Sequence, residues 1–257
     1  REFSDKFGAK GCFFGVNGAS GLIQSAIISM ANPGENILMP RNVHISVIKI
    51  CAMQNINPIF FDLEFSTKTG HYKPITKIWL ENVFKKLNFD ENKIAGVILV
   101  NPSYHGYAGD LEPLIDCCHQ KNLPVLVDEA HGSYFLFCEN LNLPTPALSS
   151  NADLVVNSLH KSLNGLTQTA ALWYKGNLIN EDKLIKSINL LQTTSPSSLL
   201  LSSCEESIRD WLNKKSLSKY QKRILEAKSI YKKLIQKNIP LIETQDPLKI
   251  VVNTSKA

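Results

Sequence analysis

No apolar run in this sequence approaches the roughly 18 residues of a membrane-spanning helix, so we expect no contact with a membrane. The six cysteines form no CxxC pair and no disulfide-like spacing, which indicates a reducing cytoplasm and argues against a structural zinc site. The phosphate loop GxxxxGK followed by Ser or Thr is also missing, so the DEAH string at 128–131 does not indicate a helicase. Internal repeats and low-complexity linkers are absent as well.

The composition is that of a soluble globular protein with a sizeable core. The chain has 257 residues, of which 44% are hydrophobic and 20% charged, enough for one large domain or two modest ones. Its net charge of +5 is densest in "KSLSKYQKRILEAKSIYKK" at 215–233. Acidic and apolar residues interrupt this stretch, which favours a solvated helix face over a nucleic-acid groove.

Short runs rich in β-branched and aromatic residues alternate with helical patterns through most of the chain. Runs such as 95–100 and 124–127 are apolar on both faces, as central parallel strands covered by helices must be. We therefore predict an α/β fold, a three-layer α/β/α sandwich around a mostly parallel sheet. The predicted strands lie within 11–16, 36–40, 57–61, 94–100, 123–130, 152–159 and 169–174.

Helical patterns fill the segments between these runs. We expect a helix over 20–35 that is capped by Ser20 and closed by "NPG", and further helices over 45–55 and 111–122. After Thr194 the pattern becomes helical, with one apolar stripe formed by Tyr220, Ile224, Ala227, Tyr231 and Leu234. This suggests a large domain over 1–210 and a long helix that begins a second domain over 211–257. Both ends of the sequence look cut, so we expect a fragment.

Four groups of polar residues lie at or near the ends of predicted strands. Two of these groups lie where a turn leads into a helix. In "VNGASGLIQ", Ser20 stands between Gly18 and Gly21 where a helix opens, and free backbone N–H groups there can cradle a phosphate. A plain turn with a helix cap explains the same residues. In "PRNVHISV", His44 lies between an apolar strand and the next helix, where a structural histidine is the simpler interpretation.

The other two groups of polar residues supply a carboxylate and an amine. Asp128 ends a buried strand in "VDEAH", and a carboxylate there needs a cationic partner because burying it unpaired costs several kcal/mol. Lys161 in "SLHKSL" follows another buried strand. Desolvation there would lower its pKa and leave a neutral amine able to form a Schiff base, unless the side chain extends to solvent.

Taken together, a phosphate cradle, a histidine, a buried aspartate and a Schiff-base lysine are the groups that bind pyridoxal phosphate. The sequence resembles the major domain of the Orn/Lys/Arg decarboxylases, which belong to the fold type I, aspartate-aminotransferase-like group. The matching stretches are "FFGVNGASG", "PRNVHISV", "NPSYHGYAGDLEPLIDCCHQKNLPVLVDEAHGSYF", "ADLVVNSLHKSLNGLTQTAAL" and "LLQTTSPSSLLLSS".

The resemblance implies a role for each of these residues. Lys161 would hold the cofactor as an internal aldimine, Asp128 would pair with its pyridinium nitrogen, and His44 would stack on its ring. The residues that would hold the phosphate or lie beside the cofactor are Ala19, Ser20, Gly21, Ala130, His131, Ser158 and His160. The cradle departs from the family, because Ala19 and Gly21 stand where hydroxyl side chains usually flank the serine.

By the same resemblance, the activity would be decarboxylation of arginine, lysine or ornithine to agmatine, cadaverine or putrescine by a cytoplasmic homodimer, without nucleic acid or membrane. An α-oxoamine synthase-like acyltransferase would use the same cofactor, but its lysine motif is SKA-like, whereas His160 precedes Lys161 here. A third interpretation is a non-catalytic relative that acts as a binding subunit. The family's small C-terminal domain is expected beyond this chain, so we expect the chain alone to bind cofactor and to decarboxylate poorly.

Overall fold

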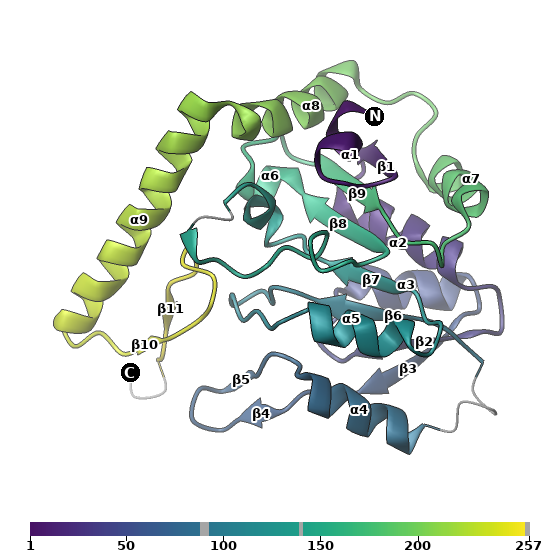
Figure 1. Cartoon of the computed structure of the whole chain (residues 1–257), viewed down its shortest axis with the longest axis horizontal. Coiled ribbons are helices and arrows are strands. Elements are labelled where there is room, and N and C mark those ends of the chain that lie inside the picture. Colours follow the sequence, from purple (N-terminus) through teal and green to yellow (C-terminus); the bar gives the residue numbers. More distant parts are fainter. Residues whose placement is uncertain (88–92, 139–140, 255–257) are drawn as a thin grey trace.

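A computed structural model of the chain describes residues 1–87, 93–138 and 141–254. Its centre is a seven-stranded sheet (Figure 1). Across the sheet the strands are β1 (Gly11–Gly15), β9 (Ala170–Tyr174), β8 (Leu154–Ser158), β7 (Val125–Asp128), β6 (Ile94–Val100), β2 (Asn36–Pro40) and β3 (Asn57–Phe61). The five strands from β8 to β3 are parallel, and β9 is antiparallel to both β8 and β1. All seven predicted strands are confirmed.

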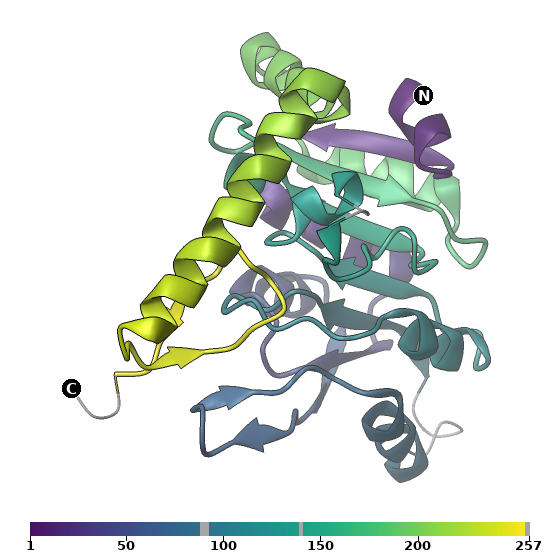
Figure 2. The same ribbon diagram turned by 60° about the vertical axis from the view of Figure 1, so that its left-hand side comes forward.

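Helices cover both faces of this sheet (Figures 1 and 2). They are α1 (Glu2–Lys6), α2 (Gly18–Met30), α3 (Ile45–Met53), α4 (Lys77–Lys86), α5 (Glu112–His119), α6 (Leu159–Ser162), α7 (Glu181–Leu191), α8 (Ser198–Leu212) and α9 (Lys214–Gln236), with a 3-10 helix η1 (Ser133–Phe137). Val97 and Val155 pack into the core with α4, α5 and α8, whereas their neighbours Ile98 and Val156 pack into the core with α2, α3 and α7. The expected three-layer α/β/α sandwich is confirmed.

The strand directions bring several loops to one edge of the sheet. Because β2, β6, β7 and β8 are parallel, the residues that follow their carboxyl ends all emerge there. Strand β1 is antiparallel to β9, which is antiparallel to β8, so β1 also points to this edge and delivers the start of α2. Five separate segments of the chain therefore converge at one place.

The start of α2 differs from the sequence-based expectation. The helix begins at Gly18 with Asn17 at its N-cap, so Ser20 lies inside the first turn and is not the cap. Gly18 adopts φ of +72° and its backbone N–H donates to Gln168 O at 2.8 Å. This contact comes from a distant segment and fixes the N-cap at Asn17, three residues earlier than Ser20. The end of the helix before "NPG" is confirmed.

The chain after Thr194 is helical, as expected, and then turns back to the loop that follows β6. The stripe of Tyr220, Ile224, Ala227, Tyr231 and Leu234 is confirmed, because these residues are buried or half-buried, whereas most other residues of α9 are exposed. Two short antiparallel strands follow, β10 (Leu241–Ile242) and β11 (Val251–Val252). The predicted domain boundary after residue 210 falls within α8 and stays a prediction. No helix in the described part of the chain is long and apolar enough to cross a membrane.

Candidate functional site

A cavity of about 140 Å³ opens at the edge of the sheet where the five segments converge. Most of the residues singled out from the sequence line it. Its walls are formed by Ala19, Ser20, Ile23, Asn42, His44, Val100, Tyr104, Asp128, Ala130, His131 and Lys161. The structure thus brings together the start of α2, the start of α3 and the ends of β6, β7 and β8. We call this space the lysine cavity.

Asp128 is the last residue of β7 and supplies a buried carboxylate to the lysine cavity. Its Oδ1 accepts a hydrogen bond from the backbone N–H of Ala130 at 3.1 Å. Burial raises the pKa of Asp128, while this hydrogen bond and the charges of Lys161 and His44 act in the opposite direction. Among the described residues, no cation lies within ion-pair distance of this carboxylate. The group is therefore suited to a cationic ligand in the cavity.

Lys161 lies in the short helix α6, directly after β8, and its amine enters the lysine cavity. The residue as a whole is exposed, yet its amine is partly withdrawn from water, so features of both interpretations of this lysine are present. Partial withdrawal from water still lowers the pKa of Lys161, and the positive charge of Lys249 lowers it further, against the attraction of Asp128. Lys161 Nζ lies 3.1 Å from His131 Nε2. A neutral amine at this place can act as a nucleophile.

His131 follows β7 and forms the wall beside Lys161. Burial lowers the pKa of His131 to about 4, with smaller effects from the charges of Lys161, Lys249 and His44. The imidazole is therefore neutral at pH 7. In the tautomer that carries its proton on Nδ1, its Nε2 accepts a hydrogen bond from the lysine amine.

The start of α2 supplies the proposed anion cradle. Ala19 and Ser20 line the lysine cavity, whereas Gly21 does not. A Cβ added to Gly21 would lie 2.9 Å from Gln192 Nε2 and 3.2 Å from Asn17 Cβ. This glycine therefore lets the side chains of Gln192 and Asn17 lie close to the helix backbone. The first backbone N–H groups of a helix have no partner within it and favour an anion.

His44 has a structural task as well as a place in the cavity wall. It is the N-cap of α3, and its Nδ1 accepts from the backbone N–H of Ser46 at 3.2 Å and lies 2.8 Å from Ser46 Oγ. These contacts fix the orientation of the ring, which lines the lysine cavity. The structural interpretation and the ligand-binding one therefore apply to the same side chain.

Ser158 and His160 do not line the lysine cavity in this structure. Ser158 is fully buried, and its Oγ lies 3.2 Å from His160 Nδ1. The same ring nitrogen lies 3.2 Å from Thr169 O, the carbonyl of the residue directly before β9. Both side chains are engaged behind the cavity wall, and their contact with a phosphate stays a prediction.

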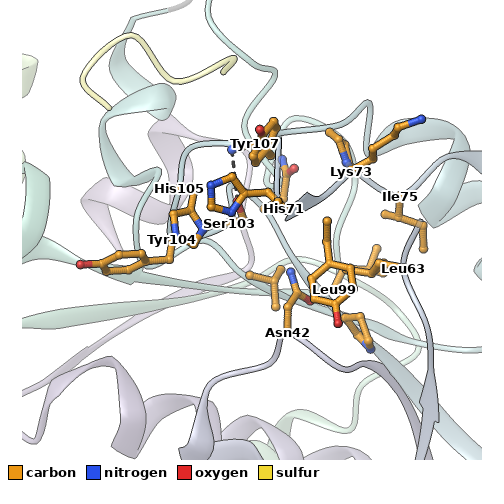
Figure 3. A pocket seen from close by; sticks show the side chains of 16 residues that line it. Asn42, Leu63, His71, Lys73, Ile75, Leu99, Ser103, Tyr104, His105 and Tyr107 are labelled. Carbon is orange, nitrogen blue, oxygen red and sulfur yellow. Dashed lines mark hydrogen bonds between the residues drawn. The ribbon is translucent and has the colours of Figure 1, made fainter. Parts of the chain in front are cut away.

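Sequence reasoning missed several residues at this edge. Tyr104 is 71% exposed, lines the lysine cavity, and lies edge-on to His131 with ring centroids 5.4 Å apart. Asn42, Val100 and Tyr104 also line a neighbouring cavity of about 340 Å³, which we call the side chamber (Figure 3). Tyr104 follows β6 as the other site residues follow their strands, and this position is the signal that could have found it.

The side chamber has an apolar floor and a rim of imidazoles. Figure 3 shows His71 beside His105, and their ring centroids are 4.1 Å apart. Burial lowers the pKa of His105, and the charges of His71 and Lys249 lower it further. No carboxylate lines this chamber among the residues that the structure describes. The chamber is therefore not by itself complementary to a cation.

A polar network lies behind Asp128, inside the fold. Glu129 is buried; its Oε1 accepts from Ala147 N at 2.8 Å and its Oε2 from Asn157 Nδ2 at 3.1 Å. Asn157 Oδ1 in turn accepts from Trp173 Nε1 at 2.8 Å. Burial raises the pKa of Glu129 to about 8, and the hydrogen bonds limit this rise. This network holds the chain at the end of β7, next to the carboxylate of the site.

Comparison with known proteins identifies the family. Residues 2–255 match the family described as Orn/Lys/Arg decarboxylase, major domain. An arginine decarboxylase of Bacillus cereus is 38% identical over 199 residues, which cover 77% of this chain and 42% of that enzyme. The chain thus spans less than half the length of this relative. A protein of Bacillus subtilis named YaaO is 31% identical over 264 residues, covering 98% of this chain and 53% of that protein.

Solved structures share the fold at low sequence identity. Lysine decarboxylase A from Pseudomonas aeruginosa superposes with a TM-score of 0.78 at 19% identity, over 91% of this chain and 33% of that one. A serine palmitoyltransferase from Sphingomonas wittichii gives a TM-score of 0.71 at 17% identity, over 95% of this chain and 57% of that one. Together with the family match, these findings confirm the resemblance seen in the sequence. The chain belongs to the Orn/Lys/Arg decarboxylase family and carries its major domain.

Proposed function

We propose that the protein is a pyridoxal phosphate-dependent decarboxylase of a basic amino acid. One observation carries this proposal: the buried carboxylate of Asp128 and the amine of Lys161 face the same cavity, beside the imidazole of His44. A buried acid that has no ion-pair partner in the described part of the chain and an amine with a lowered pKa are the two groups that this cofactor requires. The family match and the arginine decarboxylase relatives support the same conclusion.

The residues of the lysine cavity fit the parts of pyridoxal phosphate. Asp128 would keep a proton on the ring nitrogen, and a cation there would return this buried carboxyl to its ionised form. Ser20 and the backbone N–H groups at the start of α2 would hold the phosphate, and His44 and Ala130 would contact the ring. When bound, the cofactor supplies an electron sink for the pair of electrons that carbon dioxide leaves behind.

Lys161 and His131 would handle the amine and its proton. Lys161 would hold the cofactor covalently and give way to the substrate amine. The neutral imidazole of His131, with Nε2 at 3.1 Å from Lys161 Nζ, would orient the lysine amine and accept its hydrogen bond. Tyr104, edge-on to His131, would limit the movement of that ring and cover the cavity mouth.

Arginine is the substrate that the sequence relatives favour, with lysine and ornithine as the alternatives. The side chamber adjoins the lysine cavity and is large enough to receive an aliphatic side chain. No carboxylate lines the side chamber among the described residues. We therefore infer that the acidic group that binds the cationic end of the substrate comes from elsewhere in the protein.

We further propose a cytoplasmic homodimer that produces an amine of the polyamine class. Six free cysteines fit a reducing compartment. Helix α3, which begins at His44 of the site, exposes Ile45 by 57% and Met53 by 71%. Large apolar side chains in such positions fit contact with another subunit near the cavity.

The test is release of labelled carbon dioxide from arginine, lysine and ornithine by the whole protein saturated with pyridoxal phosphate. We expect release from at least one of the three, and none from norleucine, which lacks the cationic end. Lys161→Ala should abolish the release, and Lys222→Ala, an exposed lysine of α9, should leave it unchanged. Full cofactor loading without release from any basic amino acid would refute the proposal.

A further inference from the structure

The chain beyond α9 returns to the site through a short segment, residues 244–249, which we call the C-terminal strap (Figure 2). Its anchor is Asp246, which is 1% exposed. Asp246 Oδ1 accepts from Tyr134 Oη at 2.5 Å and from the backbone N–H of Leu248 at 2.9 Å. These two hydrogen bonds turn the strap and hold it against η1.

The strap is also seated on the loop that follows β6. The backbone N–H of Asp246 donates to Gly106 O at 3.0 Å, and the backbone N–H of Ala108 donates to Gln245 Oε1 at 3.0 Å. Gly106 has φ of +90°, and a Cβ added to it would lie 2.8 Å from both Cβ and Cγ of Lys249. The glycine therefore allows the stem of Lys249 to lie directly on this loop.

This seating brings the ammonium group of Lys249 to the mouth of the lysine cavity. Lys249 Nζ lies 5.7 Å from the ring centroid of Tyr104, a wall residue of both cavities. Lys249 is also close enough to lower the pKa of His105, His131 and Lys161. A positive charge thus stands near the entrance to the site, although its residue lies far along the chain from the other site residues.

This charge has no carboxylate partner within ion-pair distance among the described residues. Asp246 is the nearby acid and feels the charge of Lys249, but no ion pair joins the two: Tyr134 and a backbone N–H occupy its Oδ1, and its buried Oδ2 has no hydrogen-bond partner. Lys161 lines the lysine cavity itself, but its amine is needed as a nucleophile. Arg41, next to the wall residue Asn42, is paired with Asp62 at 2.6 Å.

We propose that Lys249 binds the α-carboxylate of the amino acid substrate and that the C-terminal strap exists to hold it there. This inference rests on the proposed function, because an α-carboxylate is the group that a decarboxylase must receive. A charge-assisted hydrogen bond from an ammonium group is the fitting partner for that carboxylate. Lys249 is thus a substrate-positioning residue that joins the site only through the anchored strap.

The proposal predicts an unusual kinetic pattern. The carboxylate loses its negative charge as carbon dioxide forms, so Lys249 stabilises the bound substrate more than the transition state. Removing its charge should therefore raise KM about tenfold or more without lowering kcat. A residue that only supports the fold would lower kcat together with the amount of folded protein.

The test uses Lys249→Gln and Lys249→Arg in the whole protein loaded with pyridoxal phosphate, since both substitutions keep a long stem over Gly106. Lys222→Gln on α9 is the matched control. Binding of arginine and of agmatine, which lacks the carboxylate, is measured by calorimetry in the Lys161→Ala background, where turnover is abolished. Lysine and cadaverine provide a second pair.

We expect Lys249→Gln to weaken the binding of arginine and of lysine about tenfold or more and to leave the binding of agmatine and cadaverine unchanged. The affinities of Lys249→Arg should be close to those of the protein with Lys249. Equal losses for acid and amine, no loss for either, or no binding of the amino acids to the parent protein would overturn the proposal. A failure of the proposed function would appear separately, as absence of carbon dioxide release from the unmodified protein. If Lys249→Gln does not fold, Lys249→Met, which also keeps a long stem without the charge, takes its place, and equal losses of affinity for the amino acid and for the amine would again refute the proposal.

Discussion

The buried carboxyl of Glu129 should make the protein lose stability as pH rises. Its pKa is about 8 in the folded chain against 4.5 for the free side chain. The folded state therefore holds this proton more tightly than the unfolded state does. The resulting stabilisation is complete below pH 4.5 and is lost as the pH rises through about 8.

The magnitude follows from these two values. Each pH unit between them changes the free energy of unfolding by about 1.4 kcal/mol, or roughly 5 kcal/mol over the whole interval. Glu129→Gln removes the titration. It also sets an amide N–H₂ against Asn157 Nδ2, because Asn157 Oδ1 is committed to Trp173 Nε1. This mismatch costs about 1–3 kcal/mol at every pH.

The assay is urea unfolding of the parent protein and of Glu129→Gln at several pH values between 5 and 8. We expect the free energy of unfolding of the parent, relative to the variant, to fall by about 1.4 kcal/mol per pH unit. Burial also raises the pKa of Asp128 and of Asp246, but these effects occur in both proteins and cancel in the difference. Glu226→Gln, on the exposed face of α9, should match the parent throughout. Parallel curves for Glu129→Gln and the parent would refute a protonated Glu129.

Lys161→Ala should remove the absorption band of lysine-bound cofactor and leave the melting temperature of the cofactor-free protein unchanged, because the side chain is exposed; an unchanged band would mean that another lysine holds the cofactor. Asp128→Asn should keep cofactor binding but slow carbon dioxide release by several orders of magnitude, at about 1.4 kcal/mol of barrier per factor of ten; a rate within tenfold of the parent would contradict the role of this carboxylate. Gly106→Ala should destabilise the protein by about 1–3 kcal/mol in urea unfolding, because φ is +90° and the new Cβ meets Lys249. An unchanged unfolding midpoint would show that the strap does not bear on this glycine.

Much of the fold was readable from the sequence because the central strands are buried on both faces. The run 94–100 is continuous and apolar and is followed by Asn101, and the run 154–156 is apolar and is followed by Asn157 and Ser158. Chain order then placed Asp128, Lys161 and His44 at one edge without any knowledge of contacts, since parallel strands share their carboxyl edge.

The parts that sequence reasoning missed depend on contacts between distant segments. The start of α2 is set by the bond from Gly18 N to Gln168 O, which no local pattern reveals. Lys249 lies in a segment that looked like the beginning of another domain, and its place beside Tyr104 depends on the buried anchor Asp246. Lys161 follows a buried strand, but its residue is largely exposed, and only its contacts in the folded chain show that its amine still enters the cavity.

The construction of the lysine cavity from five separate segments has a consequence for how the protein responds to its cofactor. Residues from Ala19 to Lys161 must be in place together before the walls exist, and no single hairpin or helix pair contains them. A ligand of this cavity therefore binds the assembled sheet and has no counterpart site in the unfolded chain. Its binding energy adds to the stability of the whole sheet, by about 2.7 kcal/mol when the free ligand exceeds its Kd a hundredfold. Depletion of the cofactor would then expose the chain to proteolysis along its full length and not only at the site.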